Sequence, residues 1–334
     1  MKNTATLKKI SDHLNISIST VSRALKDHPD VSPETKKRVK ELAELMDYEP
    51  NAFAVNLRKK HSNLFGIIVP EVSTFFYHAF IQAVEESARK KGYAVMILQS
   101  LNNAELEKEN LRLCRHNHVA GIFVAISDQT TNLEPFKKIE ALDIPLVFFD
   151  KVPAVDTFNK VCLADEAAGS LAAEKIIPAG KAKVLAIFGN PALSITVRRQ
   201  KGFENTLKNK GPHIALYTAH AHSLEEAARV AHTQLATLGP NTAIFSMSDE
   251  IMCGVLKACN QLGLQIPTQV SLLTISNGFL PGLFNPVIDY VETNGYQLGK
   301  LSFDRMQEIM DGKTFVRENL LNCSYYPGGS LCFK

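Results

Sequence analysis

The sequence predicts a small all-α unit followed by a larger α/β body of two lobes, each built on a doubly wound parallel sheet. Short apolar stripes at helical spacing occupy the first part of the chain. Two successive series of short apolar runs, separated by amphipathic segments, occupy the rest. Charge is divided in the same way. Residues 1–62 carry 12 Lys and Arg against 8 Asp and Glu, whereas the rest of the 334-residue chain carries 25 against 26. A basic end on a neutral body suggests a nucleic-acid-binding module.

Composition excludes several classes of protein. Hydrophobic residues make up 45% of the chain and charged residues 21%, which is typical of a globular protein and unlike a disordered one. No apolar run approaches the roughly 18 residues that span a bilayer, so we expect no membrane association. Residues 1–6 lead into a charged segment rather than a signal core, which favours a cytoplasmic protein. The six cysteines form no CxxC pair, and most of them are expected to be buried reduced thiols: Cys114, Cys162, Cys253, Cys259, Cys323 and Cys332.

Two short helices with a very short turn between them are predicted first. Apolar side chains at helical spacing predict a helix over residues 7–14: Leu7, Ile10 and Leu14. Ser17 then suits the N-cap of a second helix. The buried face of that helix is apolar: Val21, Ala24 and Leu25. Because the turn is too short for independent packing, we expect the steep crossing of a helix-turn-helix.

A third helix is predicted to open at Ser32-Pro33-Glu34. This string supplies a cap, a proline for the first turn and a carboxylate at the positive helix end. The apolar stripe of the helix follows: Val39, Leu42, Ala43 and Met46. The three helices should form a small bundle with one recognition face.

The outward face of the second helix is a candidate for reading DNA. In a helix-turn-helix, residues near the start of the second helix reach base edges in the major groove. Ser19 and Arg23 can donate hydrogen bonds there, and Ile18 can pack on a thymine methyl. Thr20 and Ser22 are better suited to phosphate oxygens. The alternative is a bundle whose polar face meets only water, and the pattern by itself favours neither interpretation.

Four strings of residues carry a resemblance to a known family. They are Thr6-Leu7-Lys8-Lys9-Ile10, Ile16-Ser17-Ile18-Ser19-Thr20-Val21-Ser22-Arg23-Ala24-Leu25, Val31-Ser32-Pro33-Glu34-Thr35 and Tyr48-Glu49-Pro50-Asn51-Ala52. With these strings at these distances, the chain resembles the LacI/GalR (lactose-repressor and galactose-repressor) family of bacterial transcription regulators. The likeness continues along essentially the whole chain. It implies a helix-turn-helix DNA-binding domain over 1–49, a hinge helix and linker over 50–62, and a periplasmic-binding-protein-like domain for effector binding and dimerisation over 63–334.

The resemblance gives the segment after the bundle a specific role. In the family a hinge helix forms on DNA, pairs with its dimer mate and inserts a leucine, here Leu57, into the minor groove. A helix of only about two turns is marginal in isolation. The family commonly has Arg at the position of Val55, and a simple interdomain linker is the alternative interpretation. The residues expected to contact DNA are Thr6, Ser17, Ile18, Ser19, Thr20, Ser22, Arg23, Asn51, Ala54, Leu57 and Arg58.

Eight buried strands are predicted in the body, in two series. The first series covers 64–69, 94–98, 121–126 and 146–149, and the second covers 184–188, 214–217, 243–246 and 271–275. Ligands of such sheets bind beyond the carboxyl ends of strands, so the expected site is the cleft between the lobes. Polar residues follow the predicted strands: Glu71, Ser73, Ser127, Asp150, Asn190, Asp249, Ser276 and Asn277.

The resemblance implies an effector pocket in that cleft. Asp150 and Arg199 match positions that commonly bind effector hydroxyls, and together they suit adjacent hydroxyls or a carboxylate. Many members carry Asp-Asp where this chain has Ser276-Asn277, and glutamine is frequent at Thr293, so the best-known ligands of the family are unsafe guesses. The expected pocket residues are Phe75, Phe76, Ser127, Asp150, Arg199, His222, Asp249, Ser276, Asn277 and Thr293.

The resulting hypothesis is a ligand-responsive regulator, most often a repressor in this family. It would bind a pseudo-palindromic operator as a homodimer or tetramer and respond to a sugar or related metabolite. No catalytic residue, cofactor or metal site is expected, because the chain lacks the nucleotide-binding glycine motifs and the G-x-S-x-G elbow. A periplasmic-type solute-binding protein and a dinucleotide-dependent enzyme are alternatives. The absent signal segment opposes the first, and the absent glycine fingerprint opposes the second.

Overall fold

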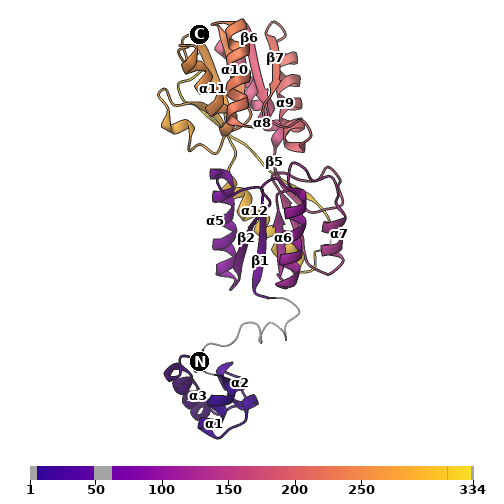
Figure 1. Cartoon of the computed structure of the whole chain (residues 1–334), viewed down its shortest axis with the longest axis vertical. Coiled ribbons are helices and arrows are strands. Elements are labelled where there is room, and N and C mark those ends of the chain that lie inside the picture. The colour runs from indigo at the N-terminus through magenta and orange to yellow at the C-terminus, as the bar shows by residue number, and fades with distance from the viewer. Residues whose placement is uncertain (1–5, 49–61, 314, 332–334) are drawn as a thin grey trace. The chain divides into compact units, whose positions relative to one another are not determined.

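The chain forms two compact units, Met1–His61 and Ser62–Lys334. The computed structural model describes residues 6–48, 62–313 and 315–331 (Figure 1). Four of the residues predicted to contact DNA lie outside this described part: Asn51, Ala54, Leu57 and Arg58. Because the two units are separate bodies, each is described by itself.

The first unit is a bundle of three helices: α1 Leu7–Leu14, α2 Ile18–Leu25 and α3 Pro33–Leu45. Each helix begins behind a hydroxyl side chain that accepts a hydrogen bond from a backbone N–H three residues later. These caps are Thr6, Ser17 and Ser32. Asn15 ends α1 in the left-handed region, with φ of 55°, and so turns the chain sharply into α2. The core of the unit is small: Ile10, Val21, Ala24, Val31, Val39 and Ala43.

The first lobe of the second unit is a sheet of parallel strands in the order β11-β5-β4-β3-β1-β2. Its strands are β1 Leu64–Val69, β2 Ala94–Gln99, β3 Gly121–Val124, β4 Leu146–Phe149, β5 Lys160–Leu163 and β11 Glu318–Leu321. Its helices are α5 Phe75–Lys90, α6 Ala104–His116, α7 Glu134–Glu140 and α12 Gly295–Met310. The first and last of these helices pack on one apolar core, and the other two pack on a second core across the sheet.

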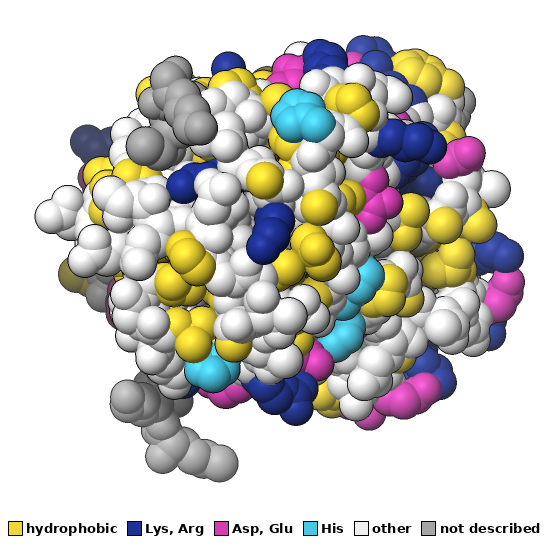
Figure 2. All heavy atoms as spheres, turned by 90° about the horizontal axis from the view of Figure 1, so that it is seen from above, with side chains coloured by type: hydrophobic (Ala, Val, Ile, Leu, Met, Phe, Trp, Pro, Cys, Tyr) yellow, Lys and Arg dark blue, Asp and Glu magenta, His cyan; other side chains and the backbone are white. Residues whose placement is uncertain are grey.

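The second lobe has the strand order β12-β10-β9-β8-β6-β7, in which only β12 is antiparallel. Its strands are β6 Lys183–Phe188, β7 Ala215–His220, β8 Thr242–Ser246, β9 Val270–Ser276, β10 Asp289–Glu292 and β12 Tyr325–Tyr326. Its helices are α8 Asp165–Ile176, α9 Ser194–Lys210, α10 Leu224–Leu238 and α11 Asp249–Gln261, with short 3-10 turns at Ile177–Ala179 and Pro281–Leu283. Figure 2 shows hydrophobic side chains interspersed with charged and polar ones, as on an ordinary solvated surface.

The eight predicted strands are present, but two of them, β2 and β7, are exposed or half-buried rather than buried, because each lies at an edge of its sheet. The prediction of one continuous series for each lobe was also incomplete. The chain crosses between the lobes three times: after β5, after β10 and after β11. Figure 1 shows the result as the late, yellow α12 inside a lobe that is otherwise purple. Among the described residues, every helix is too short or too polar to cross a bilayer.

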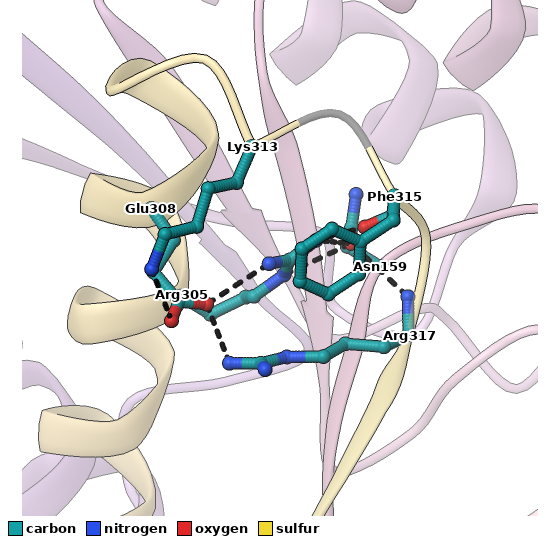
Figure 3. Close-up of polar contacts among 6 residues, drawn as sticks. All are labelled: Asn159, Arg305, Glu308, Lys313, Phe315 and Arg317. Carbon is teal, nitrogen blue, oxygen red and sulfur yellow. Dashed lines mark hydrogen bonds and ion pairs between the residues drawn. The ribbon is translucent and has the colours of Figure 1, made fainter.

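A buried arginine of α12 holds the segment that follows this helix against the first lobe (Figure 3). Arg305 of α12 donates from Nε and Nη2 to the Asn159 side-chain oxygen, at 3.0 and 2.6 Å, and its Nη2 also donates to the Phe315 carbonyl. Glu308 accepts from Arg305 at 2.9 Å and also pairs with Arg317. The connection between α12 and β11 is thereby held against the residue that precedes β5. This contact explains how β11 reaches β5 at the edge of the sheet.

Candidate functional site

Five of the predicted DNA-contact residues lie on α2, and Thr6 and Ser17 lie at the N-caps of α1 and α2. Ile18 is 47% exposed, a large apolar side chain that the small core does not use. Ser19 and Arg23 are also exposed, whereas Thr20 and Ser22 are half-buried. Thr6 and Ser17 are exposed as well, but their oxygens cap helices.

The start of α2 is arranged to accept an anion. Its first turn contains no acidic residue, whereas the first turn of α3 contains Glu34. The positive end of the α2 dipole is therefore not neutralised within its own helix. The Ser17 hydroxyl lies 2.7 Å from that of Ser19 and 2.8 Å from that of Thr20, so three hydroxyls cluster at this end. Such a group of donors suits a phosphate.

Arg23 leaves most of its guanidinium available. Its Nε donates to the Ser19 carbonyl at 3.4 Å, which is a long contact. Among the described residues its two terminal nitrogens have no hydrogen-bond partner. These two nitrogens form the planar pair of donors that matches O6 and N7 of guanine.

The second unit contains a cavity of about 640 Å³ lined by both lobes. Glu71 follows β1 and Asp150 follows β4 in the first lobe, while Asn190 follows β6 and Asn277 follows β9 in the second. Both sheets therefore present the carboxyl ends of their strands to one space, as expected for doubly wound sheets. The volume is ordinary for a small-molecule site.

Nine of the ten predicted pocket residues line this cavity: Phe75, Phe76, Asp150, Arg199, His222, Asp249, Ser276, Asn277 and Thr293. Ser127 does not line it. The Ser127 backbone N–H donates to Glu107 of α6 at 2.7 Å, which turns the residue into the protein, and the neighbouring Asp128 lines the cavity instead. Sequence reasoning missed several other lining residues, among them Tyr77, Asn102, Lys151 and Thr196. Thr196 could have been found from its place three residues before Arg199, since residues at that spacing share a helix face.

Asp150 is held by a tyrosine from α5. The Tyr77 hydroxyl donates to Asp150 Oδ2 at 2.7 Å. Burial, followed by the nearby charge of Asp150, raises the pKa of Tyr77 well above its ordinary value, so the hydroxyl stays protonated and remains a donor. Asp150 has φ of 55°, a left-handed conformation that Asp tolerates better than most residues. The other carboxylate oxygen is left to accept from a ligand.

Arg199 is fixed from behind by two acceptors. Its Nε donates to Asp165 of α8 at 2.8 Å, and its Nη1 donates to the Met247 carbonyl at 3.0 Å. Both partners of the ion pair are buried, and burial raises the pKa of Asp165 to about 6 although Arg199 opposes the shift. The orientation of the guanidinium is therefore set before any ligand binds. Its Nη2 has no hydrogen-bond partner among the described residues.

Two glycines bring the helices of this ion pair into backbone contact. A Cβ at Gly169 of α8 would lie 2.0 Å from the Arg199 carbonyl oxygen, and one at Gly202 of α9 would lie 1.9 Å from that of Glu166. Neither position has room for a side chain. This close approach places Asp165 beside Arg199.

Three polar atoms in residues that line the cavity are buried without a partner among the described residues. They are Oδ1 of Asp249, Oγ1 of Thr196 and Oδ1 of Asn102. A buried polar atom without a partner costs about 1–3 kcal/mol. Burial raises the pKa of Asp249, although hydrogen bonds from Ser276 and Asn277 oppose the shift. These atoms are enclosed by protein rather than exposed to the cavity space.

An aromatic pair joins the two lobes beside the cavity. Phe75 begins α5 in the first lobe, and Phe279 lies in the loop after β9 in the second. Their ring centroids are 4.2 Å apart, with the planes inclined by 37°. Phe75 also lines the cavity, so this contact lies at its boundary.

Comparison with known proteins covers nearly all of the chain. The profile described as periplasmic binding proteins and sugar binding domain of LacI family matches residues 62–327. The profile described as bacterial regulatory proteins, lacI family, matches residues 6–51. The ribose operon repressor of Halalkalibacterium halodurans is 28% identical over 302 residues, which cover 89% of this chain and 88% of that protein. The transcriptional repressor PurR of Vibrio vulnificus is 25% identical, covering 92% and 93%.

Solved structures share the fold at lower identity. The lac repressor dimer bound to operator and the anti-inducer ONPF superposes with a TM-score of 0.87 at 19% identity, covering 99% of this chain and all of that one. The complex of the transcriptional regulator CelR with cellobiose superposes with a TM-score of 0.72 at 17% identity, covering 98% and 99%.

Proposed function

The chain belongs to the LacI family of bacterial regulatory proteins, and on this premise we propose that it is a repressor with a metabolite-binding cavity in its second unit. It is a DNA-binding transcription regulator. We propose that it binds a pseudo-palindromic operator as a homodimer and that a sugar or related metabolite alters this binding. The observation that carries the proposal is the cavity, whose wall comes from both lobes and contains Asp150 from one and Arg199 from the other.

On the DNA side, we propose that α2 enters the major groove. Arg23 would donate hydrogen bonds from its two terminal nitrogens to a guanine, and Ile18 would pack on a thymine methyl. The three clustered hydroxyls at the start of α2 would bind a phosphate, together with the positive end of the helix dipole. Asn51, Ala54, Leu57 and Arg58 remain predictions for the hinge, since they lie outside the described residues.

On the effector side, we propose that Asp150 and Arg199 bind adjacent hydroxyls of the ligand. They stand on different lobes, so a ligand that contacts both favours one arrangement of the lobes over others. A coupling free energy of about 1–3 kcal/mol between the cavity and DNA is enough for a 5–150-fold change in operator affinity. The ribose operon repressor and PurR, to which the chain is similar, are both repressors, which supports the proposed regulatory role.

We further propose that the protein acts in the cytoplasm, where its DNA target lies, and that it is a binding protein rather than an enzyme. The relatives named as repressors support this proposal. A periplasmic solute-binding protein would need no recognition helix, and residues 6–51 match the regulatory-protein profile.

The test is a selection from genomic DNA. The full-length chain is incubated with sheared fragments of the source genome, and the bound fragments are sequenced. We expect enrichment of fragments that share an inverted repeat, and loss of this enrichment with Arg23→Ala. Uniform recovery of fragments by the unaltered protein would contradict the proposed operator binding.

A further inference from the structure

The charged side chains around the cavity are unevenly matched. Five carboxylates line it: Glu71, Asp128, Asp150, Asp249 and Glu250. Only two cationic side chains, Lys and Arg, join them among the described residues: Lys151 and Arg199.

Both of these cations are already paired. Lys151 Nζ lies 2.5 Å from Asp128 Oδ1, in an ion pair that is mostly buried. Arg199 Nε lies 2.8 Å from Asp165, which stands behind the cavity wall. Each cation is therefore paired with a carboxylate of the protein, which compensates its positive charge.

The four remaining carboxylates have no ion-pair partner among the described residues. Three of these four carboxylates accept hydrogen bonds from neutral donors. Asp150 accepts from the Tyr77 hydroxyl, and Glu250 accepts from a backbone N–H at 3.2 Å. Asp249 accepts from Ser276 and from a backbone N–H. Glu71 and Glu250 are exposed to solvent, whereas Asp150 is buried and Asp249 is half-buried. The cavity thus holds an excess of negative charge, which is least screened at these two aspartates.

The ionisation of the acidic groups agrees with this excess. Burial raises the pKa of Asp249. Burial also raises the pKa of Glu250, and the like charge of Glu71 across the cavity adds to the shift. A ligand with a positive charge would relieve both effects, whereas a phosphate or carboxylate would add a like charge. Among the described residues that line the cavity, the one guanidinium nitrogen without a hydrogen-bond partner is Nη2 of Arg199. An anionic ligand could accept a hydrogen bond from it.

The polar groups of the wall point the same way. Carboxylates and the Asn190 and Asn277 side chains line the cavity, and carboxylate oxygens are acceptors that need donors. An ammonium group offers three donors and no acceptor, while a hydroxyl offers one donor and also accepts.

Building on the proposed function, we propose that the effector is an amine-bearing polyol. Its ammonium group lies beside Asp249 and Glu250, and its hydroxyls bond to Asp150 and Arg199. A neutral sugar has no positive charge to pair with these carboxylates. A sugar phosphate or sugar acid carries the opposite charge.

The experiment sorts the small molecules of the source bacterium by charge. A polar metabolite extract is separated at neutral pH on ion-exchange resins into cationic, neutral and anionic fractions, and each is added to the full-length chain in a thermal-shift measurement. We expect the cationic fraction to raise Tm. Acetylating its amines with acetic anhydride should abolish the shift, because the amide has no positive charge.

A matched pair of variants tests whether the positive charge of the ligand is bound in the cavity. Asp249→Asn keeps the shape of the side chain and should weaken binding of the active fraction about tenfold to a hundredfold, since charge-assisted hydrogen bonds are the stronger ones. Asp304→Asn makes the same chemical change at an exposed position of α12 and should leave the shift intact. The Tm of each variant without ligand reports whether it is folded.

The outcomes separate this inference from the function on which it rests. Stabilisation by the neutral or the anionic fraction alone would overturn the amine while leaving a ligand-responsive regulator. Equal responses of Asp249→Asn and the unaltered protein would also overturn it. Failure of all three fractions to shift Tm would contradict the effector cavity itself.

Discussion

The two units hold their most important arginines in opposite ways. Arg23 in the first unit is exposed and makes one long hydrogen bond to its own helix. Arg199 in the second unit is 5% exposed and is bonded to a buried carboxylate and a backbone carbonyl. The first arginine can adapt to its target, at a cost in side-chain entropy on binding. The second is oriented in advance, so its removal affects the fold as well as the ligand.

The largest effect should come from breaking the buried ion pair. Arg199→Ala leaves Asp165 buried without its cation, and this should lower the free energy of unfolding of the second unit by about 3–5 kcal/mol. Chemical denaturation followed by circular dichroism measures it. Lys201→Ala is the control, because its ion pair with Glu166 is exposed and should contribute only about 0–1 kcal/mol. Equal losses for the two variants would refute the contrast between the arginines.

The next effect concerns the small core of the first unit. Ile10 is fully buried in a core of six residues, so Ile10→Ala should destabilise that unit by about 2–5 kcal/mol. We expect operator binding to be lost while ligand binding by the second unit persists. Gel shifts and thermal shifts on the same sample test both halves. If ligand binding fell as well, the units would not be energetically separate.

Removing the exposed arginine should leave stability unchanged. Arg23→Ala should weaken binding to the specific operator by about 1–3 kcal/mol and relax one base position. Fluorescence anisotropy with the specific duplex and a scrambled duplex measures the difference. An equal loss on both would show that Arg23 contacts only phosphate.

The smallest effect should come from the aromatic pair between the lobes. A ring pair contributes about 0.5–1.5 kcal/mol beyond the area that it buries. A double-mutant cycle with Phe75→Leu and Phe279→Leu should give a coupling energy in this range. Purely additive single effects would mean that the contact does not hold the lobes together.

Local features of the fold were predictable from the sequence. The caps Ser17 and Ser32 act on N–H groups three residues away, so a short string contains the whole interaction. Six of the eight predicted strands are buried apolar runs that need no partner to be recognised, whereas β2 and β7 are exposed or half-buried along their length. The sequence analysis missed β11, which begins with Glu318 and Asn319 and alternates exposed and half-buried residues at the edge of the sheet.

Long-range features of the candidate site were not predictable. Asp150 was found from its place after a predicted strand and from the resemblance, but its partner Tyr77 lies 73 residues away in the sequence. Ser127 follows a strand as a site residue should, but a carboxylate 20 residues earlier turns it away from the cavity. The pairing of charges around Lys151 and Arg199 likewise depends on which residues the fold brings together.

The triple crossing between the lobes has a consequence for biosynthesis. α12 covers the apolar side of α5, with Gly299 set against the backbone of Phe80, and β11 completes the same lobe. On the ribosome, the first lobe therefore remains unfinished until Leu321, the last residue of β11, has emerged. The face around Phe80 and Val84 stays uncovered throughout elongation, and it is the surface that a molecular chaperone would shield.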